Sequence, residues 1–265
     1  MEHVVIIGNG IAGITAARHI RKHSNRRLTV ISDESKHFFS RPALMYIYMG
    51  HMQYEQTKPY EDWFWKENAI DLVYDRVRKI DTKRKKAILR SGSSIPFDKL
   101  IIATGSKPNK FGWPGQDLNG VQGFYSLQDL ETVKQNTAGI RHAVIVGGGL
   151  IGVELAEMLV TRGIRVIFLV RETHFWGVVL PEEEGDLVAR HIKNHHVDLQ
   201  FESELKEIVG DSDGKVSAVI TGKGEKVPCS FVGLTVGVSP NIDFIKNTAI
   251  ETDRGVLINS CFETS

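Results

Sequence analysis

The sequence is poor in cysteine, with Cys229 and Cys261 as its two thiols among 265 residues. They lie far apart and form no Cys-x-x-Cys pair, which argues against a zinc site and against a dithiol redox centre. Isolated cysteines usually behave as small hydrophobic side chains. We therefore expect any redox chemistry to depend on bound cofactors rather than on sulfur atoms of the protein.

An excess of charge and a long apolar run are also missing. The 33 Lys and Arg residues nearly balance the 32 Asp and Glu residues, which argues against a nucleic-acid binder and against a membrane-surface protein. No apolar run approaches the roughly 20 residues of a membrane span, and the first strand begins too early to leave room for a signal peptide. We expect a cytoplasmic enzyme with no nucleic-acid or membrane partner.

A β-branched apolar run that ends in glycines occurs twice. Residues 4–13 read Val-Val-Ile-Ile-Gly-Asn-Gly-Ile-Ala-Gly, and residues 143–152 read Ala-Val-Ile-Val-Gly-Gly-Gly-Leu-Ile-Gly. Each copy fits a buried parallel strand followed by G-x-G-x-x-G and the start of a helix. The first glycine permits the tight turn, the second lets the backbone approach a pyrophosphate, and the third lets the helix pack on the strand. Two copies predict two dinucleotides, as in an electron-transfer enzyme.

The candidate dinucleotide contacts are the glycine loops and the helix starts behind them. There, unpaired N–H groups and roughly half a positive charge of helix dipole meet the phosphates. In the first copy these residues are Gly8, Asn9, Gly10, Ile11, Ala12 and Gly13, and in the second they are Gly147, Gly149, Leu150, Ile151 and Gly152.

An acidic residue follows the second strand of the first copy, which we expect at residues 28–31. About 20 residues past the glycines, this fingerprint places a carboxylate that binds the adenosine ribose. Asp33 and Glu34 both stand there, and we choose Glu34. A solvated loop carboxylate is the alternative interpretation.

The matching position of the second copy bears on the choice between NADH and NADPH. The strand expected at 165–170 is followed by Arg171 and Glu172. An arginine pairs with a ribose 2′-phosphate, whereas a carboxylate hydrogen-bonds a 2′-OH and repels the phosphate. Arg171 therefore favours NADPH, and the adjacent Glu172 opposes that preference.

Phe39, Arg41, Pro42 and Leu44 stand in the spacing aromatic-x-Arg-Pro-x-Leu, and Ala103-Thr104-Gly105 follows an apolar strand. With the two glycine loops, these motifs make the chain resemble the flavoprotein reductases of the pyridine nucleotide-disulfide oxidoreductase superfamily. Within them it is most similar to the ferredoxin and rubredoxin reductases and to the flavin-binding part of the NAD(P)H nitrite reductase large subunit. The resemblance covers essentially the whole chain.

The resemblance implies FAD and NAD(P)H as cofactors, and no catalytic acid, base or nucleophile. It implies further cofactor contacts at Arg41, Pro42, Val77, Ala103, Thr104, Gly105, Glu154 and Gly237. Arg41 is expected near the flavin pyrophosphate, and Glu154 near the nicotinamide. Tyr46 stands where many relatives place a lysine beside the isoalloxazine, so it and Glu154 are the candidate neighbours of the reacting rings.

The resemblance also implies the fold class. We expect an α/β protein with two Rossmann-like βαβ dinucleotide-binding domains with parallel sheets, the second inserted in the first, each with a small antiparallel β-meander. Residues 1–112 would begin the FAD-binding domain, 113–239 would form the NAD(P)-binding domain, and 240–265 would return to the first. Relatives continue further, so we expect a front part of such an enzyme, incomplete in its FAD-binding domain.

The implied activity is hydride transfer from nicotinamide to flavin, with electrons passed to an external acceptor such as ferredoxin, rubredoxin or a nitrite reductase-like partner. Antiparallel strands are expected at 76–80, 85–89 and 95–100. Lys83-Arg84-Lys85-Lys86, at the first turn, is either a solvated tip or a docking site for a small acidic electron carrier.

Two other readings of the chain stay open: a truncated nucleotide-binding module without turnover of its own, and a subunit completed by another chain. His191, His195 and His196 lie near the end of a helix expected over 182–196. Because no carboxylate or thiolate ligands accompany them, no metal site is expected there.

Overall fold

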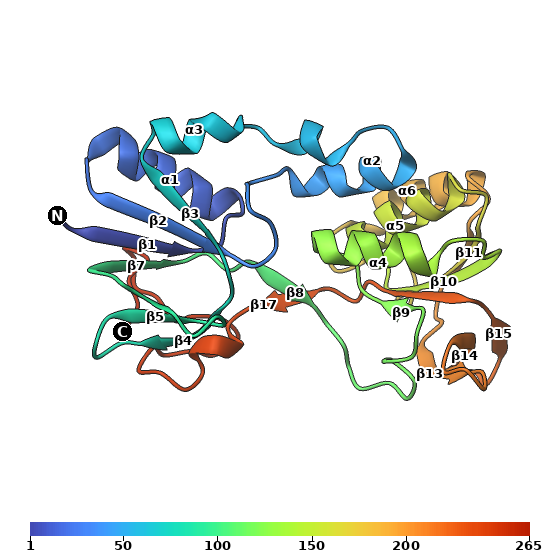
Figure 1. Cartoon of the computed structure of the whole chain (residues 1–265). Coiled ribbons are helices and arrows are strands. Elements are labelled where there is room, and N and C mark those ends of the chain that lie inside the picture. The colour runs from blue at the N-terminus through green and yellow to red at the C-terminus, as the bar shows by residue number, and fades with distance from the viewer. The chain divides into compact units, whose positions relative to one another are not determined.

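The computed structural model describes residues 1–265 and divides them into two compact units. Unit 1 comprises Met1–Ser40, Gln53–Lys107 and Ser239–Ser265, and unit 2 comprises Arg41–Met52 and Pro108–Val238. The second unit is thus inserted in the sequence of the first, as the colour gradient of Figure 1 shows. Both units combine helices with a parallel sheet and an antiparallel meander, which confirms the predicted fold class.

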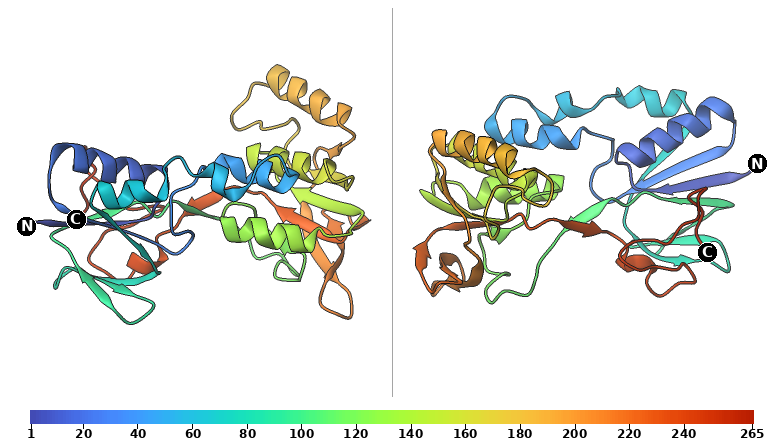
Figure 2. Two further views of the ribbon diagram at one scale, coloured as in Figure 1. Left: turned by 45° about the horizontal axis from the view of Figure 1, so that its top comes forward. Right: turned by 180° about the vertical axis from the view of Figure 1, so that it is seen from behind.

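Unit 1 contains a four-stranded parallel sheet with the order β3-β2-β1-β7. Its strands are β1 (His3–Ile7), β2 (Arg27–Ser32), β3 (Ile70–Tyr74) and β7 (Lys99–Ile102). Its helices are α1 (Ile11–His23) and α3 (Asp62–Glu67), with the short 3-10 segments η2 (Tyr54–Thr57) and η3 (Asp243–Ile245). Figure 2 shows this sheet from two further directions.

Strand β1 is apolar from Val4 to Ile7 because both faces of the sheet are covered. Successive side chains of a strand point to opposite faces. Val4 and Ile6 pack in a cluster with Ile14 of α1. Val5 and Ile7 pack in a second cluster, which holds side chains of the antiparallel meander and of the return segment near η3. The sequence of β1 therefore reads as a continuous hydrophobic run, as expected for a parallel strand.

The meander of unit 1 consists of β4 (Val77–Asp81), β5 (Lys86–Leu89) and β6 (Ser94–Pro96). One sequence expectation needs correction here, because residues 95–100 do not form a single strand. The chain leaves the meander after Pro96, the backbone N–H of Asp98 donates to the carbonyl oxygen of His3, and β7 then joins the parallel sheet. The carboxylate of Asp98 also accepts from the backbone N–H of His3 at 2.7 Å, which fixes this change of sheet.

Unit 2 contains a five-stranded parallel sheet with the order β12-β11-β10-β16-β9. These strands are β9 (Val121–Gln122), β10 (His142–Val146), β11 (Arg165–Leu169), β12 (Asp198–Gln200) and β16 (Phe231–Leu234). The helices are α4 (Leu127–Asn136), α5 (Leu150–Val160) and α6 (Glu182–Asn194), and the meander is β13 (Leu205–Gly210), β14 (Val216–Thr221) and β15 (Lys226–Pro228). The strands β8 (Ser106–Pro108) and β17 (Val238–Pro240) form a separate two-stranded sheet.

The segment η1 (Arg41–Ala43) and α2 (Leu44–Met49) is packed with unit 2, whereas the sequence analysis grouped it with residues 1–112. The buried hydroxyl of Tyr48 lies 2.7 Å from the Thr137 hydroxyl. The guanidinium of Arg162 lies 4.0 Å from the centre of the Tyr48 ring and donates to the Tyr48 carbonyl oxygen at 2.6 Å. These contacts attach α2 to the ends of α4 and α5.

No helix of the chain combines the length and the apolar character needed to cross a lipid bilayer.

Candidate nucleotide-binding sites

The first glycine loop joins β1 to α1. Gly8 has φ of +108°, and its backbone N–H donates to the carbonyl oxygen of Ile31 at 2.8 Å. A Cβ atom at Gly8 would lie 2.1 Å from the carbonyl oxygen of Ala103, and one at Gly13 would lie 2.0 Å from that of Gly8. By contrast, a Cβ atom at Gly10 would meet no atom within 4 Å. Two glycines therefore serve internal packing, and Gly10 leaves open space where a ligand can approach.

The start of α1 has the electrostatics of an anion site. Gly10 is the N-cap residue, no side chain caps the helix, and the first turn carries no acidic residue. The first N–H groups of the helix therefore point outward without a side-chain partner, at the positive end of a 13-residue dipole. Ala12 is exposed, and Ile11 is 72% exposed beside these groups.

The two acidic candidates after β2 have different surroundings. Asp33 is exposed, and its carboxylate pairs with Arg76 at 3.5 Å. Glu34 is half-buried, and its backbone N–H contacts the Ser32 hydroxyl at 3.3 Å. Glu34 stays the candidate ribose ligand predicted from the sequence, on the turn directly after β2.

Residues 103–105 lie against the first glycine loop. The backbone N–H of Ala103 donates to the Ile7 carbonyl oxygen at 2.8 Å. The Thr104 hydroxyl donates to the carbonyl oxygen of Asn241 at 2.8 Å, and the Asn241 N–H donates back to the carbonyl oxygen of Gly105 at 3.0 Å. Two hydrogen bonds therefore join the segment around Asn241 to the end of this strand. Val77 is different, because its side chain is 7% exposed and lies in the core.

The second glycine loop repeats this geometry in unit 2. Gly147 has φ of +112°, and a Cβ atom there would lie 2.6 Å from the carbonyl oxygen of Thr235. A Cβ atom at Gly152 would lie 2.5 Å from the ring of Phe168, whereas one at Gly149 would meet nothing within 4 Å. In both loops, therefore, the outer two glycines are closely packed and the middle glycine faces open space.

Helix α5 begins like α1. Gly149 is the N-cap residue, without a side-chain cap and without an acidic residue in the first turn. Leu150 is 55% exposed at the first helical position, as Ile11 is in the other unit, and Ile151 is half-buried behind it. The N–H groups of this turn are therefore available to a second anion.

A cavity of about 580 Å³ opens over the second glycine loop. Its walls come from residues 146–149, from the end of β11 and the segment behind it, and from residues 203–205 and 235–237. Two aromatic side chains, Phe111 and Trp113, complete the lining. This volume falls within the range of cofactor sites, and Gly237, a candidate contact, lies in its wall.

Arg171 and Glu172 both line this cavity. The Arg171 side chain is 70% exposed, the Glu172 side chain is 31% exposed, and a guanidinium nitrogen lies 3.0 Å from the carboxylate. The cavity wall thus presents one cation, Arg171, which is paired with the Glu172 carboxylate, and a second acidic residue, Glu204.

Glu154 is half-buried on α5 and does not line the cavity. Burial raises the pKa of its carboxyl group, and the nearby Glu157 carboxylate raises it further.

In unit 2, an Arg41 guanidinium nitrogen donates to the Tyr125 carbonyl oxygen at 2.7 Å, and the guanidinium lies over the Tyr125 ring at 4.4 Å from its centre. Pro42 is exposed, and Tyr46 is 44% exposed and stacks on the ring of His51.

The histidines near the end of α6 form no metal-binding cluster. The rings of His191 and His195 meet edge to face at 4.5 Å. Nowhere among residues 1–265 do three His, Cys, Asp or Glu side chains come together in an arrangement that could hold a metal ion.

Sequence reasoning did not identify the aromatic walls of the cavity. Phe111, Trp113 and Trp176 come from irregular segments, where no periodicity marks a side chain as facing a ligand. The one available signal was composition, since two of the four tryptophans fall within these segments.

Comparison with known proteins identifies a family whose sequence pattern matches nearly the whole chain. The sequence pattern of the pyridine nucleotide-disulphide oxidoreductases matches residues 2–265. The NAD(P)H nitrite reductase of Bacillus subtilis is 28% identical over 267 residues, which cover 99% of this chain and 33% of the reductase. The rubredoxin-NAD(+) reductase of Pseudomonas putida is 26% identical, over 99% of this chain and 69% of its own length.

Two solved structures share the fold over nearly all of the chain. A ferredoxin reductase from Rhodopseudomonas palustris has a TM-score of 0.93 at 25% identity, covering 100% of this chain and 66% of that one. The NADH:rubredoxin oxidoreductase from Clostridium acetobutylicum has a TM-score of 0.83 at 28% identity, covering 99% and 65%. The chain thus spans about a third of the nitrite reductase and about two thirds of the other relatives.

Proposed function

The chain belongs to the pyridine nucleotide-disulphide oxidoreductase family, and from this premise we propose that it is an FAD-dependent NAD(P)H oxidoreductase that passes electrons to an external acceptor. One observation carries the proposal. Each unit has a strand-to-helix loop whose outer glycines are locked by backbone contacts, while its middle glycine, Gly10 or Gly149, faces open space. A fold that repeats this arrangement is suited to two dinucleotides.

The residues present in unit 1 fit an FAD adenosine half. The N–H groups at the start of α1 would bind the pyrophosphate, and Glu34 would accept hydrogen bonds from the ribose hydroxyls. Ala103, Thr104 and Gly105 hold the neighbouring strand end in place. The family resemblance implies flavin contacts at Arg41, Pro42, Tyr46 and Val77, and Val77 would contribute its backbone there because its side chain lies in the core.

The cavity of unit 2 fits NAD(P)H. The glycine loop and the start of α5 would bind its pyrophosphate, and Arg171 would pair with a 2′-phosphate, which supports NADPH as the preferred donor. Glu154 is proposed to lie near the nicotinamide. The chemistry that the two bound groups supply is hydride transfer from nicotinamide to flavin, followed by electron transfer outward.

The chain's own contribution is binding, orientation and exclusion of water, without a side-chain acid, base or nucleophile. Burial raises the pKa of the Cys229 thiol to about 12, so this sulfur is a poor nucleophile. An external acceptor is therefore proposed. Relatives named as reductases of rubredoxin, ferredoxin and nitrite support a small acidic electron carrier or an iron-containing partner in that role.

The test is an anaerobic spectrum of the purified chain, supplemented with FAD. We expect a flavin absorption band that bleaches on addition of NADPH and returns when ferredoxin or rubredoxin is added. A protein that binds NADPH but takes up no FAD would contradict the proposal and identify a nucleotide-binding module. Uptake of FAD only after a second chain is added would identify a subunit of a larger reductase.

A further inference from the structure

Asn9 is the one residue of the first glycine loop whose side chain turns inward. It is 5% exposed, and its amide nitrogen donates to the carbonyl oxygen of Ser35 at 2.8 Å and contacts the Ser35 hydroxyl at 3.2 Å. Ser35 lies 26 residues further along the chain and directly follows Glu34. A buried amide therefore links the pyrophosphate loop to the segment that carries the candidate ribose ligand.

This link is the second of two between the same segments. The backbone N–H of Gly8 donates to the carbonyl oxygen of Ile31 at 2.8 Å. Residues 8 and 9 are thus bonded to residues 31 and 35, on either side of Glu34. The turn that presents Glu34 is held at both ends by the loop that would hold the pyrophosphate.

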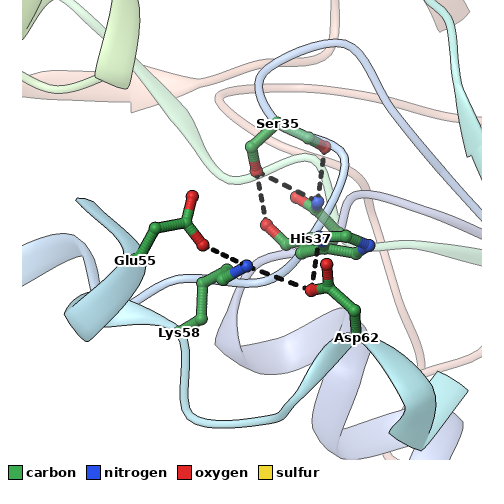
Figure 3. A network of polar contacts seen from close by, with 6 residues as sticks. Ser35, His37, Glu55, Lys58 and Asp62 are labelled. Atoms are coloured by element: carbon green, nitrogen blue, oxygen red, sulfur yellow. Dashed lines mark hydrogen bonds and ion pairs between the residues drawn. The ribbon is translucent and has the colours of Figure 1, made fainter.

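The far side of this turn is anchored as well, as Figure 3 shows. The Ser35 hydroxyl donates to the carbonyl oxygen of His37 at 2.7 Å, and the His37 ring lies 3.1 Å from the Asp62 carboxylate. Lys58 bridges Asp62 at 3.0 Å and also pairs with Glu55. The turn is therefore bonded to the glycine loop on one side and to the residues around η2 and α3 on the other.

The second glycine loop shows that the amide link is not needed to build such a loop. Gly148 occupies the position of Asn9, and a Cβ atom there would lie 2.6 Å from the Val170 side chain. Unit 2 forms the same turn, with the same locked outer glycines, without any side chain at this place. The role of Asn9 is therefore sought in what it positions rather than in the loop itself.

We propose that Asn9 is a positioning residue that sets the separation between the glycine loop and Glu34, and thereby confers selectivity for a flavin that carries an adenosine half. The inference rests on the proposed function. Ribose and pyrophosphate are joined covalently in the ligand, so their binding groups must be held within about 0.5 Å of the productive spacing. A loss of that spacing weakens contacts to the adenosine half and leaves contacts to the isoalloxazine half unchanged.

The test compares FAD with FMN, which lacks the adenosine half. Asn9→Asp keeps the size of the side chain, but an ionised carboxylate cannot donate to the Ser35 carbonyl oxygen. We expect the affinity for FAD to fall by about tenfold to a hundredfold, while the affinity for FMN changes by less than about twofold. Ser35→Ala keeps the carbonyl acceptor and is expected to have a smaller effect in the same direction.

Two controls separate positioning from damage to the fold. Asn136→Asp removes a comparable amide bond in unit 2, to the side chain of Gln122 at 2.8 Å, and is expected to leave both flavin affinities unchanged. The affinity of the Asn9 variant for NADPH, measured by tryptophan fluorescence, is expected to match that of the wild type. If Asn9→Asp does not fold, Ser35→Ala and Asn9→Ser provide the same comparison.

The outcomes are distinguishable. A wild-type chain that binds no flavin would contradict the proposed function itself. A wild type that binds FAD, with variants that lose FAD and FMN equally or lose neither, would overturn the positioning role and leave the proposed function intact. A selective loss of FAD supports both.

Discussion

The guanidinium of Arg171 lies 3.0 Å from the carboxylate of Glu172, and both side chains line the cavity of unit 2. Each residue is the partner that one nicotinamide nucleotide would use, because the cation suits a 2′-phosphate and the anion suits a 2′-OH. Their pairing means that a bound nucleotide competes with an existing ion pair. An exposed pair of this kind is worth about 0–1 kcal/mol, so the competition is inexpensive.

The first prediction concerns donor preference. Arg171→Glu is expected to lower the ratio of kcat/KM for NADPH to kcat/KM for NADH by about tenfold to a hundredfold, because a charge-assisted bond is exchanged for a like-charge contact. Steady-state kinetics with both donors measure the ratio. Glu172→Gln is expected to raise it, since Arg171 is then released. An unchanged ratio in Arg171→Glu would refute the assignment.

The second prediction separates the glycines that build the first loop from the one that faces the ligand. Gly8→Ala places a Cβ atom 2.1 Å from the Ala103 carbonyl oxygen at φ of +108°, so the free energy of unfolding is expected to fall by at least about 1–3 kcal/mol. Gly10→Ala meets no protein atom and is expected to keep its Tm while losing FAD affinity. Thermal melts and flavin titration distinguish the two variants.

The corresponding pair in unit 2 is the control for this prediction. Gly147→Ala is expected to destabilise the fold, and Gly149→Ala to lose NADPH affinity at constant Tm while FAD affinity is retained. Equal effects of Gly10→Ala and Gly149→Ala on both ligands would contradict the assignment of one site to each unit.

The third prediction concerns the attachment of α2. Tyr48→Phe removes a buried hydroxyl that lies 2.7 Å from the Thr137 hydroxyl, and is expected to lower the free energy of unfolding by about 1 kcal/mol. Thr137 retains its own bond to the Val133 carbonyl oxygen at 2.6 Å, which limits the loss. Arg162→Ala removes both the ring contact and the bond to the Tyr48 carbonyl oxygen, and is expected to cost more. Denaturant melts give both values, and no change in either variant would mean that α2 is held by other contacts.

The fourth prediction uses the difference between the two thiols. Cys261 is exposed, whereas burial raises the pKa of Cys229 to about 12. At pH 9 only about one thousandth of the Cys229 thiol would be ionised in the folded chain, because a raised pKa keeps the proton bound. A thiol reagent is therefore expected to label one cysteine between pH 7 and 9 and both after denaturation. Cys261→Ser is expected to abolish native labelling, and rapid labelling of that variant at pH 9 would show that Cys229 is accessible.

Much of the architecture was predictable because the two glycine loops encode local geometry. A β-branched run before G-x-G-x-x-G determines a buried strand, a turn that requires glycine at Gly8 and Gly147, and a helix start without a side-chain cap. Parallel sheets and the insertion of one unit in the other follow from this repeat and from the family resemblance. These features depend on a few neighbouring residues and survive in the sequence as recognisable patterns.

Other features depend on contacts that no local pattern records. The grouping of residues 41–52 with unit 2 depends on Tyr48 meeting Thr137 and Arg162, which are 89 and 114 residues away. The edge strands β3 and β12 were not identified, since β12 is short and both strands carry polar residues that interrupt an apolar run. The inward turn of Asn9 was also not foreseen, because a fingerprint specifies its glycines and leaves the intervening residue free.

The brace behind each glycine loop is the main-chain oxygen of a residue in the same unit, Ala103 for Gly8 and Thr235 for Gly147. The two braces are separate contacts, made by different residues, and each lies within its own unit. Natural drift or laboratory evolution could therefore retune the grip on one nucleotide while the other is held at constant strength. For a protein engineer, the affinities for the two nucleotides are therefore two separate targets for substitution within one polypeptide.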